Sequence, residues 1–207
     1  MTKLKRLMVT VAAAAGLLAL VTAPASAAPQ DTKDGVSVSS LGGSLKLIKA
    51  NLSGNQRSAR VAGPQQDAFL ISNVLSNRCW DAELSSIGHN GTNMLLWDCD
   101  NTKANQAFYI TQIPEGYLRF QNVQSGRYLD ASMSSIGGNG TKIQLWDFVA
   151  GGKNQWWYGT VIPEGWVRIQ TPASPRYLTA EGTVGGNGTR LQLWDFIAGG
   201  KNQWWCC

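Results

Sequence analysis

The sequence contains little charge, little histidine and no long apolar segment beyond its first residues. Only 15% of its 207 residues are charged, one is histidine and four are cysteine. The single histidine, His89, is expected on an exposed loop, and alone it supports neither a catalytic triad nor a zinc site. The low charge, together with 23 Gly and nine Trp, differs from the composition of disordered chains and of helix bundles. We therefore expect a turn-rich, all-β fold.

The net charge of +5 lies outside the aromatic-rich part of the chain. Residues 1–27 and 28–65 each contribute +3, whereas residues 66–207 hold 10 basic and 11 acidic residues. A nearly neutral domain has no broad electrostatic attraction to a phosphate backbone. We therefore expect no nucleic-acid partner.

The first 27 residues have the pattern of a secretory signal peptide. A basic start is followed by an apolar run from Leu7 to Val21 and a small-residue site at 25–27. This run is too short for a dependable membrane span, and no later run is long enough for one. We expect a secreted, extracellular protein in a compartment where disulfides persist.

Residues 28–65 are rich in Ser, Gly, Lys and Asn and contain no aromatic residue. This composition indicates a pro-segment or linker, to which we assign no firm structure. Arg57 and Arg60 are candidates for a processing point, and a retained tail is the open alternative.

From about residue 66 the sequence repeats itself three times. Trp97, Trp146 and Trp194 lie 49 and 48 residues apart. Asn-Gly-Thr begins at residues 90, 139 and 187, and Asn-Gln at 105, 154 and 202. Short runs such as 117–121 and 142–146 alternate apolar and polar residues and are bounded by Asn-Gly or Pro-Glu-Gly turns. Each copy therefore predicts about four strands.

A copy of about 48 residues cannot bury its own apolar face, so the three copies must share one core. We expect a closed barrel of roughly twelve strands with pseudo-threefold symmetry, built from repeats at about 66–116, 117–165 and 166–207. The Asn139-Gly140 turn is expected to be a primed hairpin turn, in which both central residues have positive φ.

These motifs resemble the ricin B-type, or R-type, β-trefoil lectin family, over about residues 66–207. The family unit opens with Cys-hydrophobic-Asp, continues through an Asn-Gly turn to an Ile-Gln-Leu-Trp strand, and closes with Asn-Gln-x-Trp. The matching segments are 79–81, 94–97 and 105–108 in the first copy, 128–130, 143–146 and 154–157 in the second, and 177–179, 191–194 and 202–205 in the third. The resemblance implies a β-trefoil with a shallow sugar pocket in each copy.

The chemistry of a neutral sugar accounts for the residue types of this pocket. An indole covers the C–H face of a pyranose, and a carboxylate accepts hydrogen bonds from two adjacent hydroxyls. In the second copy, the most complete, the resemblance implies that Asp130 binds the hydroxyls, that Trp146 stacks on the ring and that Asn154 bonds a hydroxyl. Gln144 and Gln155 would orient the carboxylate.

The first and third copies depart from this pattern. The first has Leu95 where the pattern has Gln, and we still expect it to bind sugar. The third has Thr179 in place of the Asp, so we expect it to bind weakly or to prefer another sugar. The site residues that these two copies retain are Asp81, Trp97, Asn105 and Gln106 in the first, and Gln192, Trp194, Asn202 and Gln203 in the third.

Strand parity separates two sets of apolar residues. The three repeated Trp residues lie on the strand face opposite to Leu96, Leu145 and Leu193, so only one set can face the core. We expect the Trp set to face the ligand. By the resemblance, the aromatic residues that end each copy, Phe108, Trp157 and Trp205, are buried.

The acidic residue after each repeated Trp needs a separate explanation. Asp98, Asp147 and Asp195 form Trp-Asp in every copy. We expect each carboxylate to tie the following loop, Gly-Gly-Lys in copies two and three, to the strand end.

Cys79 and Cys99 stand at the two half-cystine positions of the family, so the resemblance implies a structural disulfide. Tyr128 with Phe148, and Tyr177 with Phe196, replace them in the other copies. For Cys206 and Cys207 a vicinal disulfide, a dimer through an intermolecular bridge, and free thiols all stay open.

The function that the resemblance implies is that of a secreted lectin, a haemagglutinin, for glycans on cell surfaces or for polysaccharides. Its sugar would be terminal galactose or N-acetylgalactosamine, or alternatively rhamnose or a pentose, and neither cofactor nor metal is expected. Glycoside hydrolysis usually needs two carboxylates, and each copy supplies one in its pocket at most, so we expect no enzyme and assign no catalytic residue. A protease-inhibitor or toxin-type trefoil that binds protein through its loops is the alternative.

Overall fold

The computed structural model describes residues 48–53 and 67–206, and nearly all of the regular structure in them is β-strand. The first copy contains β2 (Ala68–Leu70), β3 (Ser72–Asn73), β4 (Cys79–Ala82), β5 (Thr92–Trp97) and β6 (Phe108–Gln112). The second contains β7 (Leu118–Asn122), β8 (Tyr128–Ala131), β9 (Thr141–Trp146) and β10 (Tyr158–Val161). The third contains β11 (Val167–Thr171), β12 (Ser174–Ala180), β13 (Thr189–Trp194) and β14 (Trp205–Cys206). Only Ile71 separates β2 from β3, so these two form one interrupted strand and the first copy also has four. The expected four strands per copy are therefore confirmed.

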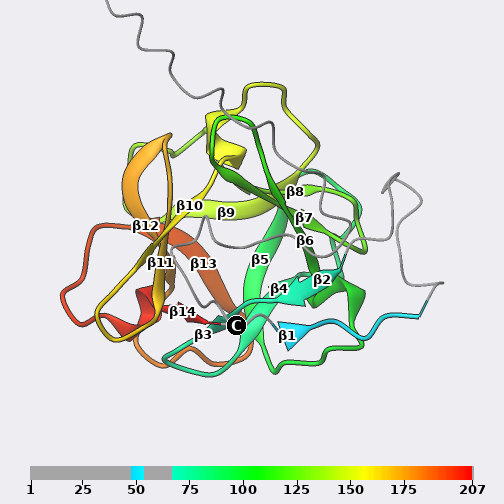
Figure 1. The fold of residues 1–207 in the computed structure, drawn as a ribbon, viewed down its shortest axis with the longest axis horizontal. Helices are drawn as coiled ribbons and strands as arrows, with labels where there is room; N and C mark the ends of the chain where they lie inside the picture. The colour runs from blue at the N-terminus through cyan, green and yellow to red at the C-terminus, as the bar shows by residue number, and fades with distance from the viewer. Residues whose placement is uncertain (1–47, 54–66, 207) are drawn as a thin grey trace, which may run out of the picture. The chain divides into compact units, whose positions relative to one another are not determined.

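The third strand of each copy builds the centre of the barrel. β5 pairs with β9, β9 with β13, and β13 with β5, so that three antiparallel pairings close on themselves. Each of these strands also pairs with the strand before it, β4, β8 or β12. Figure 1 shows β5, β9 and β13 around the middle of the view, with one copy outside each. The fold is a β-trefoil, as the repeats predict.

The core is aromatic and draws on all three copies. Trp80 meets Phe108, Phe120 and Trp205 edge-on, with ring centroids 5.2 to 5.7 Å apart. The three aromatic residues that end the copies are fully buried, as expected. The leucine set of the third strands, Leu96, Leu145 and Leu193, faces this core and is completely buried.

The Asn-Gly turns differ from the expected primed type. Gly91, Gly140 and Gly188 have positive φ, but Asn77 is the one non-glycine residue with positive φ in the described part of the chain. The primed-turn prediction is therefore wrong for Asn139. The reason is tertiary: the side chain of each turn asparagine is held by the neighbouring copy.

Each turn asparagine belongs to a polar clamp between copies. In one, Asn139 donates to Asp195 Oδ2 at 2.8 Å, and Asn139 Oδ1 accepts from the Asp195 backbone N–H and from Arg176 Nε, both at 2.8 Å. Arg176 Nε also lies 3.1 Å from Asp195 Oδ1. The same geometry recurs in the sets Asn90, Asp147 and Arg127, and Asn187, Asp98 and Arg78.

The clamps correct the role expected for the Trp-Asp carboxylates. Their side chains hold the Asn-Gly turn of another copy, and the Gln of each Asn-Gln motif ties the loop to the strand end instead. Three arginines that the sequence analysis does not single out, Arg78, Arg127 and Arg176, complete the clamps. The signal for them was present, because they recur at intervals of 49 residues.

Asn90→Ala should lower the free energy of unfolding by about 1–2 kcal/mol, because it removes hydrogen bonds to Asp147 and to the buried Arg127. Chemical denaturation followed by Trp fluorescence measures the change. Asn101→Ala, at an exposed asparagine outside the clamps, is the matched control. Equal stability of the two variants would contradict a stabilising role for the clamp.

An additional strand precedes the repeats. β1 (Ile48–Lys49) pairs antiparallel with β2, with Ile48 opposite Leu70. Ala50 N donates to Ala68 O at 2.8 Å, Asn51 N donates to Asn101 O at 2.7 Å, and Leu52 packs on the apolar cluster around Leu70. A short ordered segment therefore exists where the sequence indicates no firm structure, because the partner that orders it lies in the first copy.

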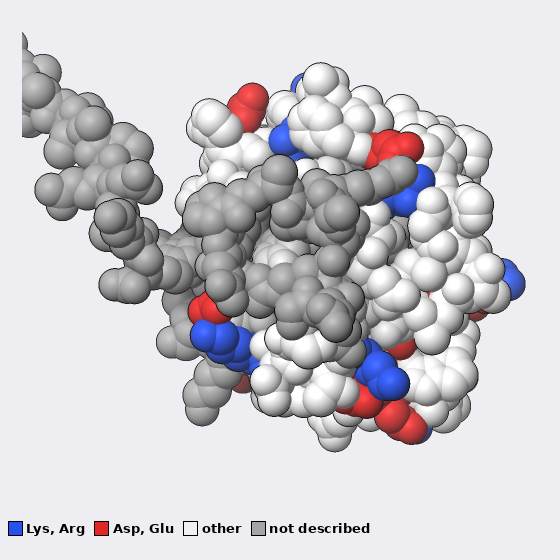
Figure 2. All heavy atoms as spheres, turned by 90° about the vertical axis from the view of Figure 1, so that its right-hand side faces the viewer, with Lys and Arg blue, Asp and Glu red and all other residues white. Residues whose placement is uncertain are grey.

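Several sequence predictions fall outside the described residues. These are the signal peptide at 1–27, the processing candidates Arg57 and Arg60, and Cys207. Among the described residues, no helix has the length and apolar character needed to cross a membrane. On the face shown in Figure 2 most of the described surface is uncharged, and basic groups lie beside acidic groups at its edge.

Candidate functional site

The carboxylate of the second copy is held by three amide groups. Asp130 lies on β8, opposite Gln144 on β9, and is buried. Gln144 Nε2 donates to its Oδ1 at 3.1 Å, while Asn154 Nδ2 and Gln155 Nε2 donate to its Oδ2 at 2.7 and 3.1 Å. The orientation of the carboxylate is therefore determined before any ligand arrives.

Gln155 supports the site from beneath and is completely buried in the 3-10 helix η4 (Lys153–Gln155). Besides Asp130, its Nε2 donates to Asp147 O at 2.9 Å, and its Oε1 accepts from Val149 N at 3.0 Å. Gln106 and Gln203 make the equivalent bonds in η3 (Ala104–Gln106) and η5 (Lys201–Gln203). These glutamines are positioning residues, because none of them is exposed to a ligand.

Asn154 was expected to bond a sugar hydroxyl, but only one of its two polar atoms is available for this. Its Nδ2 is used internally, by Asp130 Oδ2 and by Ala131 O at 3.1 Å. Its Oδ1 has no hydrogen-bond partner among the described residues, so this oxygen is the atom that can accept from a sugar hydroxyl.

The three repeated tryptophans lie on the outer face of their strands. Trp97, Trp146 and Trp194 are 46, 37 and 38% exposed, whereas the leucine directly before each of them is buried on the opposite face of the strand. A Cβ added to Gly91 would lie 4.0 Å from Trp146 Cζ3, so the Asn-Gly turn of the first copy borders this indole. A half-exposed indole next to a fixed carboxylate is a surface on which a pyranose can lie flat.

Burial raises the pKa of the Asp130 carboxyl above its usual value of 3.8, although hydrogen bonds from Gln144, Gln155 and Asn154 oppose the shift. Burial raises the pKa of Asp81 in the same way, against bonds from Gln106 and Asn105. Both carboxylates are therefore easier to protonate than exposed ones.

If Asp130 accepts from two sugar hydroxyls, as the resemblance implies, sugar binding should weaken on acidification at a pH above 3.8, because the protonated carboxyl loses this capacity. Affinity should be constant near neutral pH and then fall by up to about tenfold per pH unit below the raised pKa. Protonation relieves the cost of burying this charge, so Asp130 itself does not promote acid unfolding and binding should be lost first. Calorimetry with parallel circular dichroism measures both, and affinity unchanged down to pH 3.8 would contradict the assignment.

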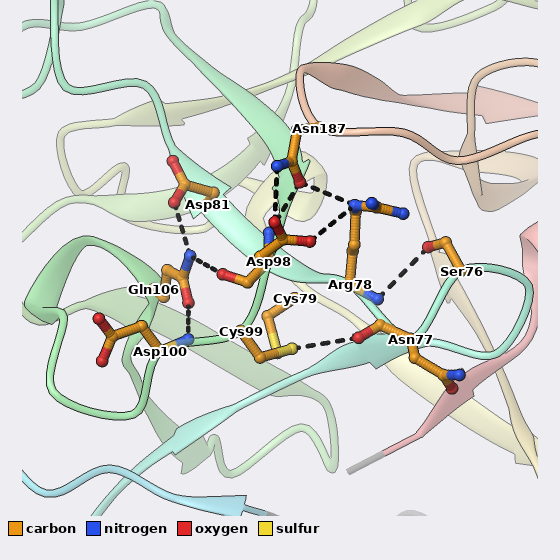
Figure 3. The surroundings of a disulfide bond; sticks show 10 residues. All are labelled: Ser76, Asn77, Arg78, Cys79, Asp81, Asp98, Cys99, Asp100, Gln106 and Asn187. Atoms are coloured by element: carbon orange, nitrogen blue, oxygen red, sulfur yellow. Dashed lines mark hydrogen bonds and ion pairs between the residues drawn. A yellow bond between two sulfur atoms is a disulfide. The ribbon is translucent and has the colours of Figure 1, made fainter.

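The first copy has a similar support and a large hollow beside it. Figure 3 shows Gln106 between Asp81, the Asp98 carbonyl and the Asp100 N–H, with the Asn187 clamp beside them. Leu95 lies opposite Asp81, so the bond that Gln144 makes in the second copy has no counterpart here. A hollow of about 950 Å³ opens between Trp97, Asp81 and Asn105.

The third copy has the supporting amide groups but lacks the carboxylate. Gln203 Nε2 donates to Thr179 Oγ1 at 3.1 Å, and Thr179 Oγ1 donates to Tyr177 O at 2.8 Å. Gln192 lies opposite Thr179 on β13, and Asn202 Nδ2 donates to the Ala180 and Gly182 carbonyls. No carboxylate stands beside Trp194 at the place of Asp130.

A disulfide joins Cys79 and Cys99, as the resemblance implies. In the other copies an aromatic pair stands at the place of the disulfide. The ring centroids are 5.6 Å apart in the pair Tyr128 and Phe148, and 5.7 Å apart in the pair Tyr177 and Phe196. An arginine that was not predicted to have a role covers each pair. Arg119 Cζ lies 4.6 Å from the ring centroid of Phe148, and Arg168 Cζ lies 4.5 Å from the ring centroid of Phe196. Within the described residues, no three His, Cys, Asp or Glu side chains gather in a way that could hold a metal ion.

Comparisons with known proteins agree with the β-trefoil fold. Residues 59–146 match the model of the ricin-type beta-trefoil lectin domain-like family. No curated protein matches the sequence. The designed threefold protein ThreeFoil has a TM-score of 0.61 and 22% identity, over 67% of this chain and 96% of its own.

Two natural structures are similar as well. A ricin B-like lectin of Macrolepiota procera, solved with lactose, has a TM-score of 0.57 and 19% identity over 70% of this chain and 96% of its own. An exo-beta-1,3-galactanase of Clostridium thermocellum has a TM-score of 0.61 and 26% identity over 70% of this chain, which spans only 30% of that enzyme.

Proposed function

We propose that the chain acts as a lectin that binds terminal sugars of glycans without transforming them, on the premise that it has a β-trefoil fold and that residues 59–146 match the ricin-type beta-trefoil lectin domain-like family. The observation that carries the proposal is the second copy, in which a fixed carboxylate lies beside a half-exposed indole. Neutral sugars with two adjacent hydroxyls, such as galactose or N-acetylgalactosamine, have the complementary chemistry, and rhamnose and pentoses are the other candidates.

Binding in the second copy uses each group differently. The apolar face of the sugar covers Trp146, which removes apolar area of both from water. Two neighbouring hydroxyls donate to Asp130, and charged acceptors make these bonds stronger than neutral ones. Asn154 Oδ1 accepts from a further hydroxyl, while Gln144 and Gln155 hold the carboxylate in place. The first copy binds by the same scheme with one support fewer.

Each such site is shallow and has low affinity. Useful binding therefore depends on several sites of one rigid domain acting together. Two sites that engage the same glycan-covered surface raise the apparent affinity by about 10²–10⁴ over a single site. The pseudo-threefold axis points the copies in different directions, which suits crosslinking between cells. We therefore propose agglutination of glycan-bearing cells by the secreted protein as its activity.

The carboxylates support binding rather than hydrolysis. Retaining and inverting glycosidases place two carboxyl groups about 5–10 Å apart around one bond. Asp130 lies opposite Gln144, two residues before Trp146, and is the carboxylate assigned to this site. The carboxylate of Asp147 is held in a clamp with Arg127.

A glycan array with free-sugar competition, followed by agglutination, tests the proposal. The full chain should bind a defined set of neutral terminal sugars. The triple variant Asp81→Ala, Asp130→Ala, Trp146→Ala should keep its unfolding transition and retain at most the weak binding of the third copy, which is too little to agglutinate cells. Val184→Ala, at an exposed apolar residue of the third copy, is the control. Agglutination that survives the triple substitution would contradict the assignment of the sugar sites and favour a trefoil that contacts protein through its loops.

A further inference from the structure

The three copies also differ at a position of the opening strand near the sugar site. Leu70 in the first copy stands where the second and third have Arg119 and Arg168, because the three residues are 49 positions apart in the repeat. Those two guanidinium groups lie over the rings of Phe148 and Phe196, and the Nε atom of each is buried without a hydrogen-bond partner. By the repeat, the aromatic ring and its arginine take the places that Cys99 and Leu70 have beside Trp97.

The first copy leaves the corresponding space open. The cystine stands in place of the Tyr and Phe rings, and Leu70 is too short to cover it as the arginines do. The resulting hollow of about 950 Å³ is continuous with the sugar site, because Trp97 and Asp81 line it together with Cys99 and Leu70. Its volume lies at the upper end of the range of about 300–1,000 Å³ that is typical of small-molecule pockets, and it exceeds what one pyranose needs.

A segment that the other copies lack forms one wall of this hollow. Ile48 of β1 pairs with Leu70 and lines the hollow, as do Leu84 and Trp97. These three side chains are 39, 60 and 46% exposed, so they offer apolar surface around one opening. Apolar side chains facing a common hollow suit the C–H faces of successive sugar rings.

The lining of the hollow is acidic. Asp81, Glu83 and Asp100 contribute carboxylates, whereas Lys103 is the one basic residue in the lining. Asp98 is also in the lining, but Arg78 balances its charge at 3.1 Å. In the second copy, Ser132 and Val149 occupy the positions of Glu83 and Asp100. The first site therefore repels acidic sugars more strongly than the second.

We propose that the first copy binds an unbranched, uncharged saccharide of two or more rings, whose terminal ring lies on Trp97 and Asp81 and whose next ring lies between Ile48 and Leu84. The second copy binds the terminal ring alone, because Phe148 and Arg119 occupy the adjoining space. This inference rests on the proposed lectin function and adds a substrate class to one of its sites.

The test compares two single-site proteins made in the full chain. Trp146→Ala with Trp194→Ala leaves the first site, and Trp97→Ala with Trp194→Ala leaves the second. Calorimetry measures Kd for galactose, β-1,3-galactobiose and β-1,3-galactotriose, and for xylose, xylobiose and xylotriose. Lactose and sialyllactose are compared in the same way.

The first-site protein should gain at least about tenfold in affinity between one and three rings of the series it binds, equal to about 1.4 kcal/mol. The second-site protein should gain less than about threefold. Ile48→Ala or Leu84→Ala, added to the first-site protein, should each reduce its gain, whereas Val184→Ala should leave it unchanged. Sialyllactose should bind the first site more weakly than lactose does.

Three results would overturn the inference. They are an equal gain in both single-site proteins, a gain that survives both Ile48→Ala and Leu84→Ala, and tighter binding of sialyllactose than of lactose to the first site. Equal gains would leave the lectin function intact. If neither protein binds any of these sugars, the inference fails as well, and the glycan array of the unaltered chain decides separately whether the lectin function stands.

Discussion

Asp130→Asn, made in the protein that retains only its second site, should weaken sugar binding by at least about 100-fold. Two hydroxyls donate to this carboxylate in the proposed complex, and a hydrogen bond to a charged group contributes about 1.5–3 kcal/mol. A loss of about 2.7 kcal/mol corresponds to that factor. Because a single shallow site has little affinity to lose, binding should fall below detection in calorimetry.

The substitution tests charge rather than shape. Asn has the size of Asp, and Gln144 can turn its amide so that its oxygen accepts from the new Nδ2, while Asn154 and Gln155 continue to donate to the remaining oxygen. The third copy already folds with the neutral Thr179 at this position. The variant should therefore unfold near the temperature of its parent, and undiminished sugar binding would show that Asp130 does not contact the ligand.

Thr179→Asp should create a sugar site in the third copy that matches the second. Gln203 Nε2 already points at this position, Gln192 lies opposite it, and Trp194 is as exposed as Trp146. The missing element is the charged acceptor, so we expect affinity at this copy to rise by about 10–100-fold. In a protein whose other sites carry Trp97→Ala and Trp146→Ala, calorimetry should detect one new site.

Thr179→Asn is the matched control, because it adds the same bulk and no charge. It should leave the third copy as weak as before. Thr179→Asp should also cost some stability, since it introduces a charge at a buried position whose donors were set for a hydroxyl. Equal binding by the two variants, or no gain with Asp in a folded protein, would show that the third copy lacks more than a carboxylate.

The repeats carry most of what could be predicted from the sequence. The spacing of 49 and 48 residues and the alternation within each copy predicted the β-trefoil and four strands per copy, because units of this size can bury their apolar faces only together. Strand parity reduced the orientation of Trp146 and Leu145 to two alternatives. The structure then chose between them, and the leucine faces the core.

The errors and omissions share one cause. The turn at Asn139 was expected to have two positive φ angles on local grounds, but the Asn139 side chain bonds Asp195 of another copy. Asp195 was expected to hold its own loop, and Arg176, which completes the clamp, was not noticed. All of these contacts connect residues 37 to 56 positions apart, where local patterns carry no information.

By itself the sequence determined the all-β class, the threefold architecture, and the pairing of an acidic residue with a tryptophan in two of the three copies. Only the tertiary structure decided that Asn154 also supports Asp130, how the copies are clamped together, and that β1 lines the first site. Periodic patterns report how a chain buries its own apolar face, whereas a polar contact or a docked strand depends on which distant residue folding brings alongside. For that reason the number of candidate sites could be read from the sequence, and the differences among them could not.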